Sequence, residues 1–376
     1  MPNQTIASNV ARLRADLDLS QAQLADRAGL SRITLGKIER GDVTPRSETL
    51  SDLARGLKVD VAELVTPVRP LPGVRFRAKK RVNSREQILA HVASWLDAYK
   101  SLERVVNDEK QFALRDLIGH KEQPAALAAK ARAALNLNSK APIRDVCGLL
   151  EDNGVKILLI QKNTDSFFGL SVTEDGGGPA VVVNTWDRIS VERWIFTAAH
   201  ELGHLLLHRD AYDRTRDEEN PDEEREADRF ASHFLMPDEV FSSEWDQTAG
   251  LPLLDRVLKV KRMFLVSYKT VLYRLVESDR LPKEAWKAFN AAHKRRFGAA
   301  LRKVDEPQRL AEGEFRLDWN KAGEPEAVSK YDFVDDRLSR LVRVALNREE
   351  ISLSRAAEIL GLSRTQMRDL AAAWES

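Results

Sequence analysis

The spacing of hydrophobic positions divides the chain into a helical beginning, a short region of strands and a long helical remainder. In the first 65 residues, apolar side chains recur at the spacing of amphipathic helices, and serines or glycines punctuate the runs. From 84 to 140 the helical pattern continues. The short N-terminal helices are expected at about 6–16, 20–28, 31–40, 47–57 and 60–65.

Beyond residue 141 the pattern changes to one helix followed by strands. The run "VKILLIQ" predicts a buried strand, and "FFGLSVTEDGGGPAVVVN" predicts a hairpin of two strands around a glycine-rich turn. Helical spacing returns at about Val191, and an acidic helix is expected from about Asp222 to Phe234, stopped by "MPD". The predicted fold class is mainly α with a small β-sheet (α+β), and the C-terminal region is helical.

The chain of 376 residues is too long for one ordinary core and is expected to contain several domains. Residues 66–83 carry six Arg or Lys, three prolines and no acid, which predicts a basic linker instead of a packed element. Such a linker either follows a phosphate backbone or is a solubilising tether. The expected parts are a five-helix domain (1–65), this linker (66–83), a core domain that contains the strands together with leading helices (84–245), a helical support segment (246–299) and a C-terminal helical segment (300–376).

Composition and charge exclude several classes of protein. A hydrophobic content of 43%, a charged content of 31% and a net charge of +1 describe a globular chain that is not a polyanion binder as a whole. No apolar run approaches the roughly 18 residues of a membrane helix, and the N-terminus lacks an apolar signal core. We therefore expect a cytoplasmic protein. The single cysteine, Cys147, excludes an internal disulfide and a cysteine zinc finger, and is expected in the core.

The stretch "FTAAHELGHLLLH" at 196–208 indicates a metal site. His200 and His204 lie four residues apart and share one helix face, so both imidazoles can bind one zinc ion (Zn²⁺). Glu201 can reach a water molecule at that ion and act as general base. The alternative is a buried helix that happens to contain histidines. A glutamate between two histidines on an apolar helix is costly without a function, which favours the metal site.

A catalytic zinc site needs a third protein ligand, for which the chain offers three alternatives. Glu224 in the acidic helix is favoured because Asp228, one turn on, can hydrogen-bond the back of a metal-bound histidine. Glu226 is the second alternative. His208 is disfavoured because a straight helix carries it one turn away from the metal. The neighbouring hairpin can hold an extended peptide by strand addition, which fits peptide hydrolysis.

The run "VVVNTWDRISVERWIFTAAHELGHLLLH", followed by "EREADRFASHFLMP", resembles the ImmA/IrrE group of bacterial metallopeptidases over roughly residues 85–280. These are gluzincin-like proteins that cleave repressors. The resemblance implies a zinc cofactor, peptide-bond cleavage, and Glu224 as ligand with Asp228 behind it. The residue that stabilises the oxyanion stays open among Arg193, His208 and Tyr212.

The N-terminal stretch "LSQAQLADRAGLSRITLGKIERG" has the form of a helix-turn-helix, with "AGLS" as its turn. It resembles the Xre/Cro phage-repressor type over residues 5–65, which implies binding to a double-stranded DNA operator as a homodimer. The alternative is a helical protein-docking domain. The C-terminal "SLSRAAEILGLSRTQMRDL" is similar, and packing or dimerisation is favoured there over DNA contact. The expected DNA-binding residues, for bases or for phosphates, are Gln21, Ser31, Arg32, Ile33, Lys37 and Arg40.

Together these features predict a DNA-binding transcriptional regulator that carries a zinc-dependent endopeptidase. Its expected substrate is a repressor or antitoxin-like protein, or the chain itself cut within 66–83. The competing hypothesis is a transcriptional repressor with a structural or sensing zinc site and no peptidase activity.

Overall fold

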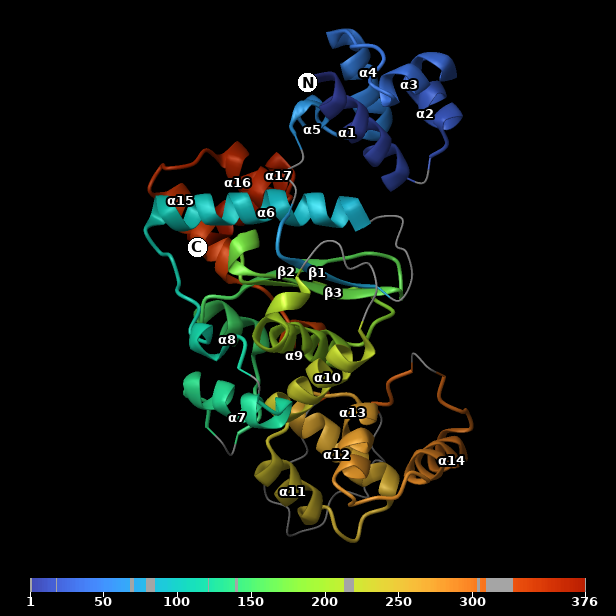
Figure 1. The fold of residues 1–376 in the computed structure, drawn as a ribbon, viewed down its shortest axis with the longest axis vertical. Helices are drawn as coiled ribbons and strands as arrows, with labels where there is room; N and C mark the ends of the chain where they lie inside the picture. The colour runs from blue at the N-terminus through green and yellow to red at the C-terminus, as the bar shows by residue number, and fades with distance from the viewer. Residues whose placement is uncertain are drawn as a thin grey trace. The chain divides into compact units, whose positions relative to one another are not determined.

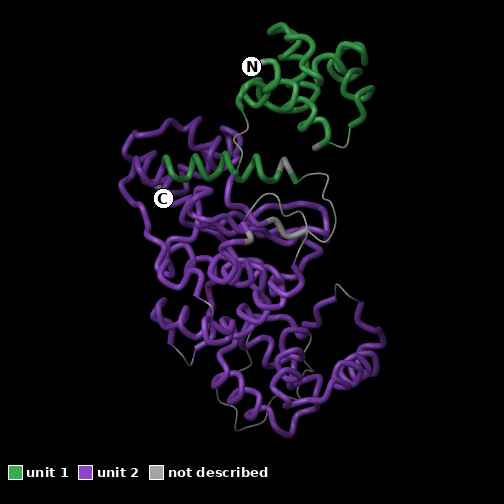
Figure 2. Tube along the Cα trace, viewed as in Figure 1, with its two compact units in different colours: residues 1–71, 80–101 green, residues 72–79, 102–376 purple. Residues whose placement is uncertain are grey.

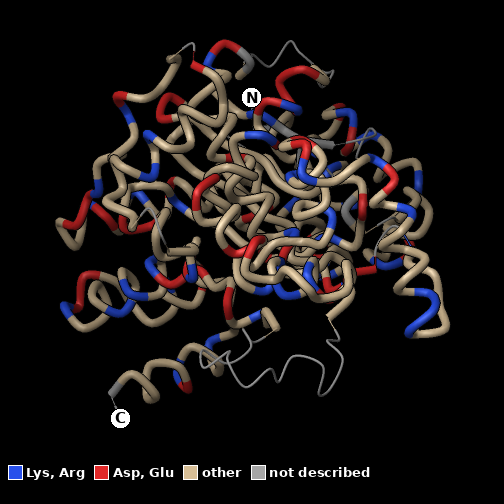
Figure 3. Tube along the Cα trace, turned by 90° about the horizontal axis from the view of Figure 1, so that it is seen from below, with Lys and Arg blue, Asp and Glu red and all other residues tan. Residues whose placement is uncertain are grey.

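The computed structural model describes residues 2–17, 19–67, 71–78, 85–120, 122–138, 141–212, 220–302, 305–308 and 327–375. The chain forms two compact units, one of residues 1–71 and 80–101 and the other of residues 72–79 and 102–376 (Figure 2). It is mainly helical with one four-stranded sheet, as predicted. Basic and acidic residues are both distributed over the described trace (Figure 3).

The first unit begins with the five expected short helices (Figure 1). The side chains of Ser20 and Ser31 cap two of them by accepting hydrogen bonds from backbone N–H groups, and Gly29 takes a φ of 65° in the turn between them. Apolar residues including Leu24, Leu35 and Ile38 form their core. The helices are α1 (Pro2–Asp16), α2 (Gln21–Arg27), α3 (Arg32–Glu39), α4 (Ser47–Leu57) and α5 (Val61–Val65).

The second unit is built around a sheet with the strand order β1-β3-β4-β2. The predicted hairpin is confirmed as the antiparallel pair β3–β4, and β2 lies parallel to β4. Between β1 and β2 the chain forms helices α6 (Arg85–Val106), α7 (Pro124–Ala134) and α8 (Val146–Asp152). Residues 85–101 of α6 belong to the first unit. The strands are β1 (Val74–Ala78), β2 (Lys156–Ile160), β3 (Phe167–Val172) and β4 (Ala180–Asn184).

The prediction of an unpacked linker at 66–83 is wrong for the residues of β1. Val74–Ala78 pairs antiparallel with β3, and the side chain of Val74 is buried. The run "VRFRA" alternates apolar and basic residues with the period of a strand, and the neighbouring prolines and charges obscured that pattern. The linker therefore contributes the edge strand of the sheet.

Helices α9 (Val191–Leu207) and α10 (Pro221–Leu235) carry the motifs singled out in the sequence. Helix α9 packs on β3 and β4, and α10 packs on α9. Two glycines permit these close contacts. A Cβ at Gly169 in β3 would lie 2.6 Å from Thr197 Cγ2, and a Cβ at Gly203 in α9 would lie 2.9 Å from Phe230 Cδ1.

The helices between residues 238 and 297 extend the core that contains the α9 residues. Phe333 belongs to the hydrophobic core that contains α9 residues, and the Arg337 guanidinium bonds Glu103 of α6 at 2.5 Å. Cys147 is a free, buried thiol, as predicted. Among the described residues no helix has the length and apolar character needed to cross a bilayer. The helices are α11 (Asp238–Gln247), α12 (Leu253–Phe264), α13 (Tyr268–Glu277), α14 (Ala285–Phe297), α15 (Arg337–Asn347), α16 (Leu353–Leu360) and α17 (Arg364–Glu375).

Candidate metal centre

Three side chains that the sequence predicts as metal ligands meet between α9 and α10. His200 Nε2 lies 2.9 Å from His204 Nε2 and 3.4 Å from Glu224 Oε2. Glu224 Oε1 lies 3.2 Å from His204 Nε2. Both histidines are fully buried. The described part of the chain contains this one group of three or more His, Cys, Asp or Glu residues within metal-binding reach.

Asp228 determines which nitrogen of His200 is available to a metal. Its carboxylate lies one turn beyond Glu224 and accepts a hydrogen bond from His200 Nδ1 at 2.8 Å. A carboxylate is an acceptor only, so Nδ1 carries the proton and Nε2 presents its lone pair to the cluster. This is the arrangement that orients metal-bound histidines in zinc proteins.

His208 and Glu226 perform the same task for His204, although each was an alternative third ligand in the sequence. The carboxylate of Glu226 accepts a hydrogen bond from His208 Nε2 at 2.9 Å. His208 Nδ1 is therefore an acceptor, and His204 Nδ1 donates a hydrogen bond to it at 2.8 Å. Burial lowers the pKa of both imidazoles, with His200 also lowering the pKa of His204. Both rings are therefore neutral near pH 7, and His204 Nε2 faces the cluster with a lone pair.

This donor set fits a zinc ion. Two ligand atoms on a tetrahedral zinc lie about 3.3 Å apart, given bond lengths of roughly 2.0–2.1 Å. The separations of 2.9, 3.2 and 3.4 Å are close to that edge length. Two neutral imidazoles and one carboxylate also form a usual ligand set for catalytic zinc, which retains an open fourth position.

Glu201 is fully buried and is held from the sheet side. Ser171 of β3 donates a hydrogen bond to Glu201 Oε2 at 2.7 Å. The hydroxyl proton of Ser171 is used in that bond, so the Tyr212 hydroxyl donates to Ser171 Oγ at 2.9 Å. Burial raises the pKa of Tyr212, which keeps its phenol protonated. The pair fixes one oxygen of the carboxylate. Ser171 was not singled out in the sequence, and its position two residues after Gly169 in a strand was the available signal.

The three residues considered for oxyanion stabilisation lie in different places. Tyr212 belongs to the network around Glu201, and His208 supports His204. The guanidinium of Arg193 lies 4.7 Å from the centre of the Phe168 ring, in a cation–π contact.

Arg75 also reaches the cluster, and sequence reasoning missed it. From β1 its guanidinium donates to Glu223 at 2.5 Å and to Glu224 at 3.2 Å. Only 11% of the Arg75 side chain is exposed. A residue of the expected linker thus contacts one of the three predicted metal ligands.

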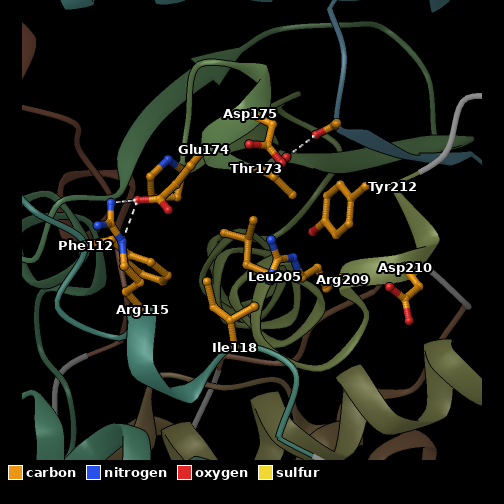
Figure 4. Close-up of a pocket in the computed structure, with 12 residues that line it drawn as sticks. Phe112, Arg115, Ile118, Thr173, Glu174, Asp175, Leu205, Arg209, Asp210 and Tyr212 are labelled. Atoms are coloured by element: carbon orange, nitrogen blue, oxygen red, sulfur yellow. Dashed lines mark hydrogen bonds and ion pairs between the residues drawn. The ribbon is translucent and has the colours of Figure 1, made fainter.

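A pocket of about 710 Å³ adjoins this region, with Tyr212 and Leu205 in its wall (Figure 4). It opens where β1 and β3 meet at their ends, since Gly73 precedes β1 and Thr173 follows β3. Its further lining is Phe112, Arg115, Ile118, Glu174, Asp175, Pro179, Arg209 and Asp210.

The expected DNA-binding residues lie on and around α3 in the first unit. Arg32, Ile33 and Lys37 are exposed, and Ile33 is 74% exposed, which is unusual for an isoleucine without a partner. Ser31 is exposed as the cap of α3, and Arg40 pairs with Asp42 at its end. Gln21 instead donates to Glu39 at 2.7 Å within the domain.

Each of the two units contains a segment that matches a known protein family. Residues 151–276 match the family model described as the IrrE N-terminal-like domain, and residues 10–64 match the helix-turn-helix model. An uncharacterized helix-turn-helix-type transcriptional regulator of Sinorhizobium fredii, y4dJ, is 42% identical over 67 residues. That alignment covers 18% of this chain and 87% of the relative. The chain belongs to the helix-turn-helix regulators. It joins a helix-turn-helix domain to an IrrE-like domain. The helix-turn-helix domain is a DNA-binding module, and the IrrE-like domain has a metallopeptidase-like fold.

Proposed function

We propose that the chain is a DNA-binding regulator whose IrrE-like domain is a zinc-dependent endopeptidase. Its substrate is a repressor or antitoxin-like protein, or the chain itself. The observation that carries this proposal is the buried carboxylate of Glu201 beside a cluster in which both histidines present lone pairs. His200, His204 and Glu224 are the proposed zinc ligands.

The chemistry follows from the placement of these groups. A bound zinc ion would supply Lewis-acid polarisation of the scissile carbonyl and of the attacking water. Glu201 takes a proton from that water and returns it to the leaving amine. Ser171 and Tyr212 keep the Glu201 carboxylate in one orientation throughout. Asp228 and His208 hold the two imidazole ligands in the required tautomers.

The competing function is transcriptional repression with a zinc site that is structural or sensing. Such a site gains nothing from a buried glutamate held by a serine and a tyrosine, and burial of a carboxylate is costly. The Ser171–Glu201 bond therefore favours hydrolysis.

For the helix-turn-helix domain we propose that α3 lies in the major groove of an operator and that two chains bind as a dimer. The exposed face of Arg32, Ile33 and Lys37 supports this placement, because guanidinium and ammonium groups bind guanine edges and an apolar side chain contacts a thymine methyl.

The test combines zinc content with hydrolysis of a quenched-fluorescent peptide library by the full chain. Glu201→Gln should retain about one zinc per chain and lose at least a hundredfold in hydrolysis, since the general base is removed. Glu224→Ala should lose zinc, measured by elemental analysis. Glu226→Ala is the matched control and should retain most of the zinc, because it acts only through His208.

Two results would contradict the proposal. Full zinc in Glu224→Ala would remove the assigned ligand. Equal hydrolysis by wild type and Glu201→Gln would remove the assigned base. If both rates are at background, the result favours the repressor without peptidase activity. Intact mass of the zinc-loaded chain, compared with Glu201→Gln, tests self-cleavage separately.

A further inference from the structure

The edge of β3 is the natural docking place for an extended peptide beside the metal centre. Ser171 of this strand bonds the proposed general base, and a Cβ at Gly169 would lie 3.4 Å from Glu201 Cγ. A chain running along the free edge of β3 therefore passes next to the proton-transfer group. Strand addition of this kind gives a peptide its main-chain hydrogen bonds.

That edge is occupied by β1 of the chain itself. The pairing is antiparallel and sets Val74 opposite Val172, Arg75 opposite Ser171 and Phe76 opposite Leu170. Arg75 thus stands opposite the residue that holds Glu201. Figure 1 shows β1 alongside β3 in the sheet.

The Arg75 side chain is bound by two carboxylates. Its guanidinium bridges Glu223 and Glu224, whose side chains are 16% and 14% exposed. Two adjacent carboxylates at the start of α10 form a receptor for a planar cation, because each accepts from a separate nitrogen of the fork. One of them, Glu224, is a proposed metal ligand.

The strand is not part of the IrrE-like domain as matched, which begins at residue 151. The connecting segment between the two domains supplies it. The matched domain alone would present β3 as an open edge, since β3 lies between β1 and β4.

We propose that β1 lies in the position of an extended substrate segment and restrains the peptidase by occupying it. The substrates that replace β1 carry an Arg or Lys opposite Ser171, bound by Glu223 and Glu224. The residues before that position enter the pocket at the Gly73 end of the strand. This inference rests on the proposed peptidase function, whose substrate class it names.

Peptide binding to the full chain tests the inference without requiring hydrolysis. The probes are a fluorescein-labelled peptide "LPGVRFRA", the sequence of residues 71–78, and the matched control "LPGVAFRA". Zinc-loaded Glu201→Gln chain is the parent, so that neither peptide is cut. Fluorescence anisotropy gives the dissociation constants.

Adding Arg75→Ala to the parent should weaken the docked strand and tighten binding of "LPGVRFRA" on the order of tenfold. The control peptide should bind several-fold more weakly than "LPGVRFRA". A further Glu223→Gln substitution should reduce that discrimination. Arg302→Ala, which removes an exposed pair with Asp305, is the control variant and should change neither affinity.

Equal affinity of the two peptides, or no tightening by Arg75→Ala, overturns the inference. Hydrolysis of the peptide library, measured in chains that retain Glu201, separates the two proposals. If the two peptides bind with different affinities but no variant hydrolyses the library, the peptidase function is wrong and the assignment of β1 to a peptide-binding position stands. Hydrolysis that Arg75→Ala does not accelerate removes the restraint and leaves the peptidase standing.

Discussion

At the scale of single residues, the sequence predicted the positions of the candidate metal ligands but not the hydrogen bonds that orient them. The spacing of His200 and His204 and the interval between Glu224 and Asp228 predicted four side chains that the structure brings together. His208 was judged by the geometry of a straight helix. It is instead the C-cap of α9, with φ −119° and ψ 47°, so its ring turns back to His204. Cap geometry depends on the chain beyond the helix and has no reliable local signal.

A buried carboxylate elsewhere in the second unit gives a prediction for the pH dependence of stability. Glu151 accepts hydrogen bonds from the backbone N–H groups of Asp336 and Arg337, and burial raises its pKa to about 7. The folded state therefore binds this proton more strongly than the unfolded state does. The resulting stabilisation is fully present below the unfolded pKa of about 4.5 and is lost as the pH rises through about 7.

Glu151→Gln should remove this contribution. Between pH 5 and pH 8, the unfolding free energy of wild type should fall by about 2 kcal/mol more than that of Glu151→Gln. Urea unfolding of both chains at the two pH values measures the difference. Asp152→Asn, at a neighbouring side chain that is 64% exposed, should show no such change. A constant difference between wild type and Glu151→Gln would contradict the assignment.

At the scale of elements, apolar periodicity predicted the helices, and two apolar runs around a glycine-rich turn predicted the hairpin, whose strands are buried on both faces. It failed for β1, where a strand of five residues lies between prolines and a basic run. Its stability comes from pairing with β3 and from the contacts of Arg75, both of which are tertiary. Strand formation depends on such neighbours more than on local preference.

The contact between α9 and α10 gives a prediction at this scale. Gly203→Ala would place a methyl group against the fully buried ring of Phe230. The gain in helix propensity is about 1 kcal/mol, whereas overpacking costs about 1–3 kcal/mol and displaces α10. Because α9 and α10 each carry proposed zinc ligands, we expect weaker zinc binding as well as a lower unfolding temperature.

A second helix-interior glycine serves as the control. A Cβ at Gly36 in α3 would meet the ends of two side chains, Arg40 at 3.4 Å and Gln21 at 4.0 Å. Gly36→Ala should therefore keep or raise the unfolding temperature and leave zinc affinity unchanged. Zinc titration and thermal unfolding of both variants test this. Unchanged zinc affinity in Gly203→Ala would show that the helix contact does not control the ligand geometry.

At the scale of the whole molecule, the two domains have separate hydrophobic cores. The domain order and both families could be inferred from sequence, because each motif lies within one domain. The pairing of the connecting segment with β3 could not be inferred, because strand pairing depends on tertiary neighbours more than on local preference.

Separate cores predict separable functions. Arg32→Ala and Lys37→Ala should each weaken binding to a duplex selected from a random pool by about tenfold, through loss of a base-edge contact. Zinc content should stay the same. Arg55→Ala on α4, exposed and paired with Asp52, should leave DNA affinity unchanged. Unaltered DNA affinity in both α3 variants would favour a protein-docking role for this domain.

The covalent attachment of β1 has a consequence for which substrates can be cut. A strand tethered beside its own docking edge competes at an effective concentration on the order of millimolar. A separate protein present at micromolar levels must therefore bind about a thousandfold more tightly than β1 to occupy the edge of β3 in half of the molecules. A repressor held on the same stretch of DNA would meet this condition through its own high local concentration. The attached strand would thus confine proteolysis to partners assembled on the operator.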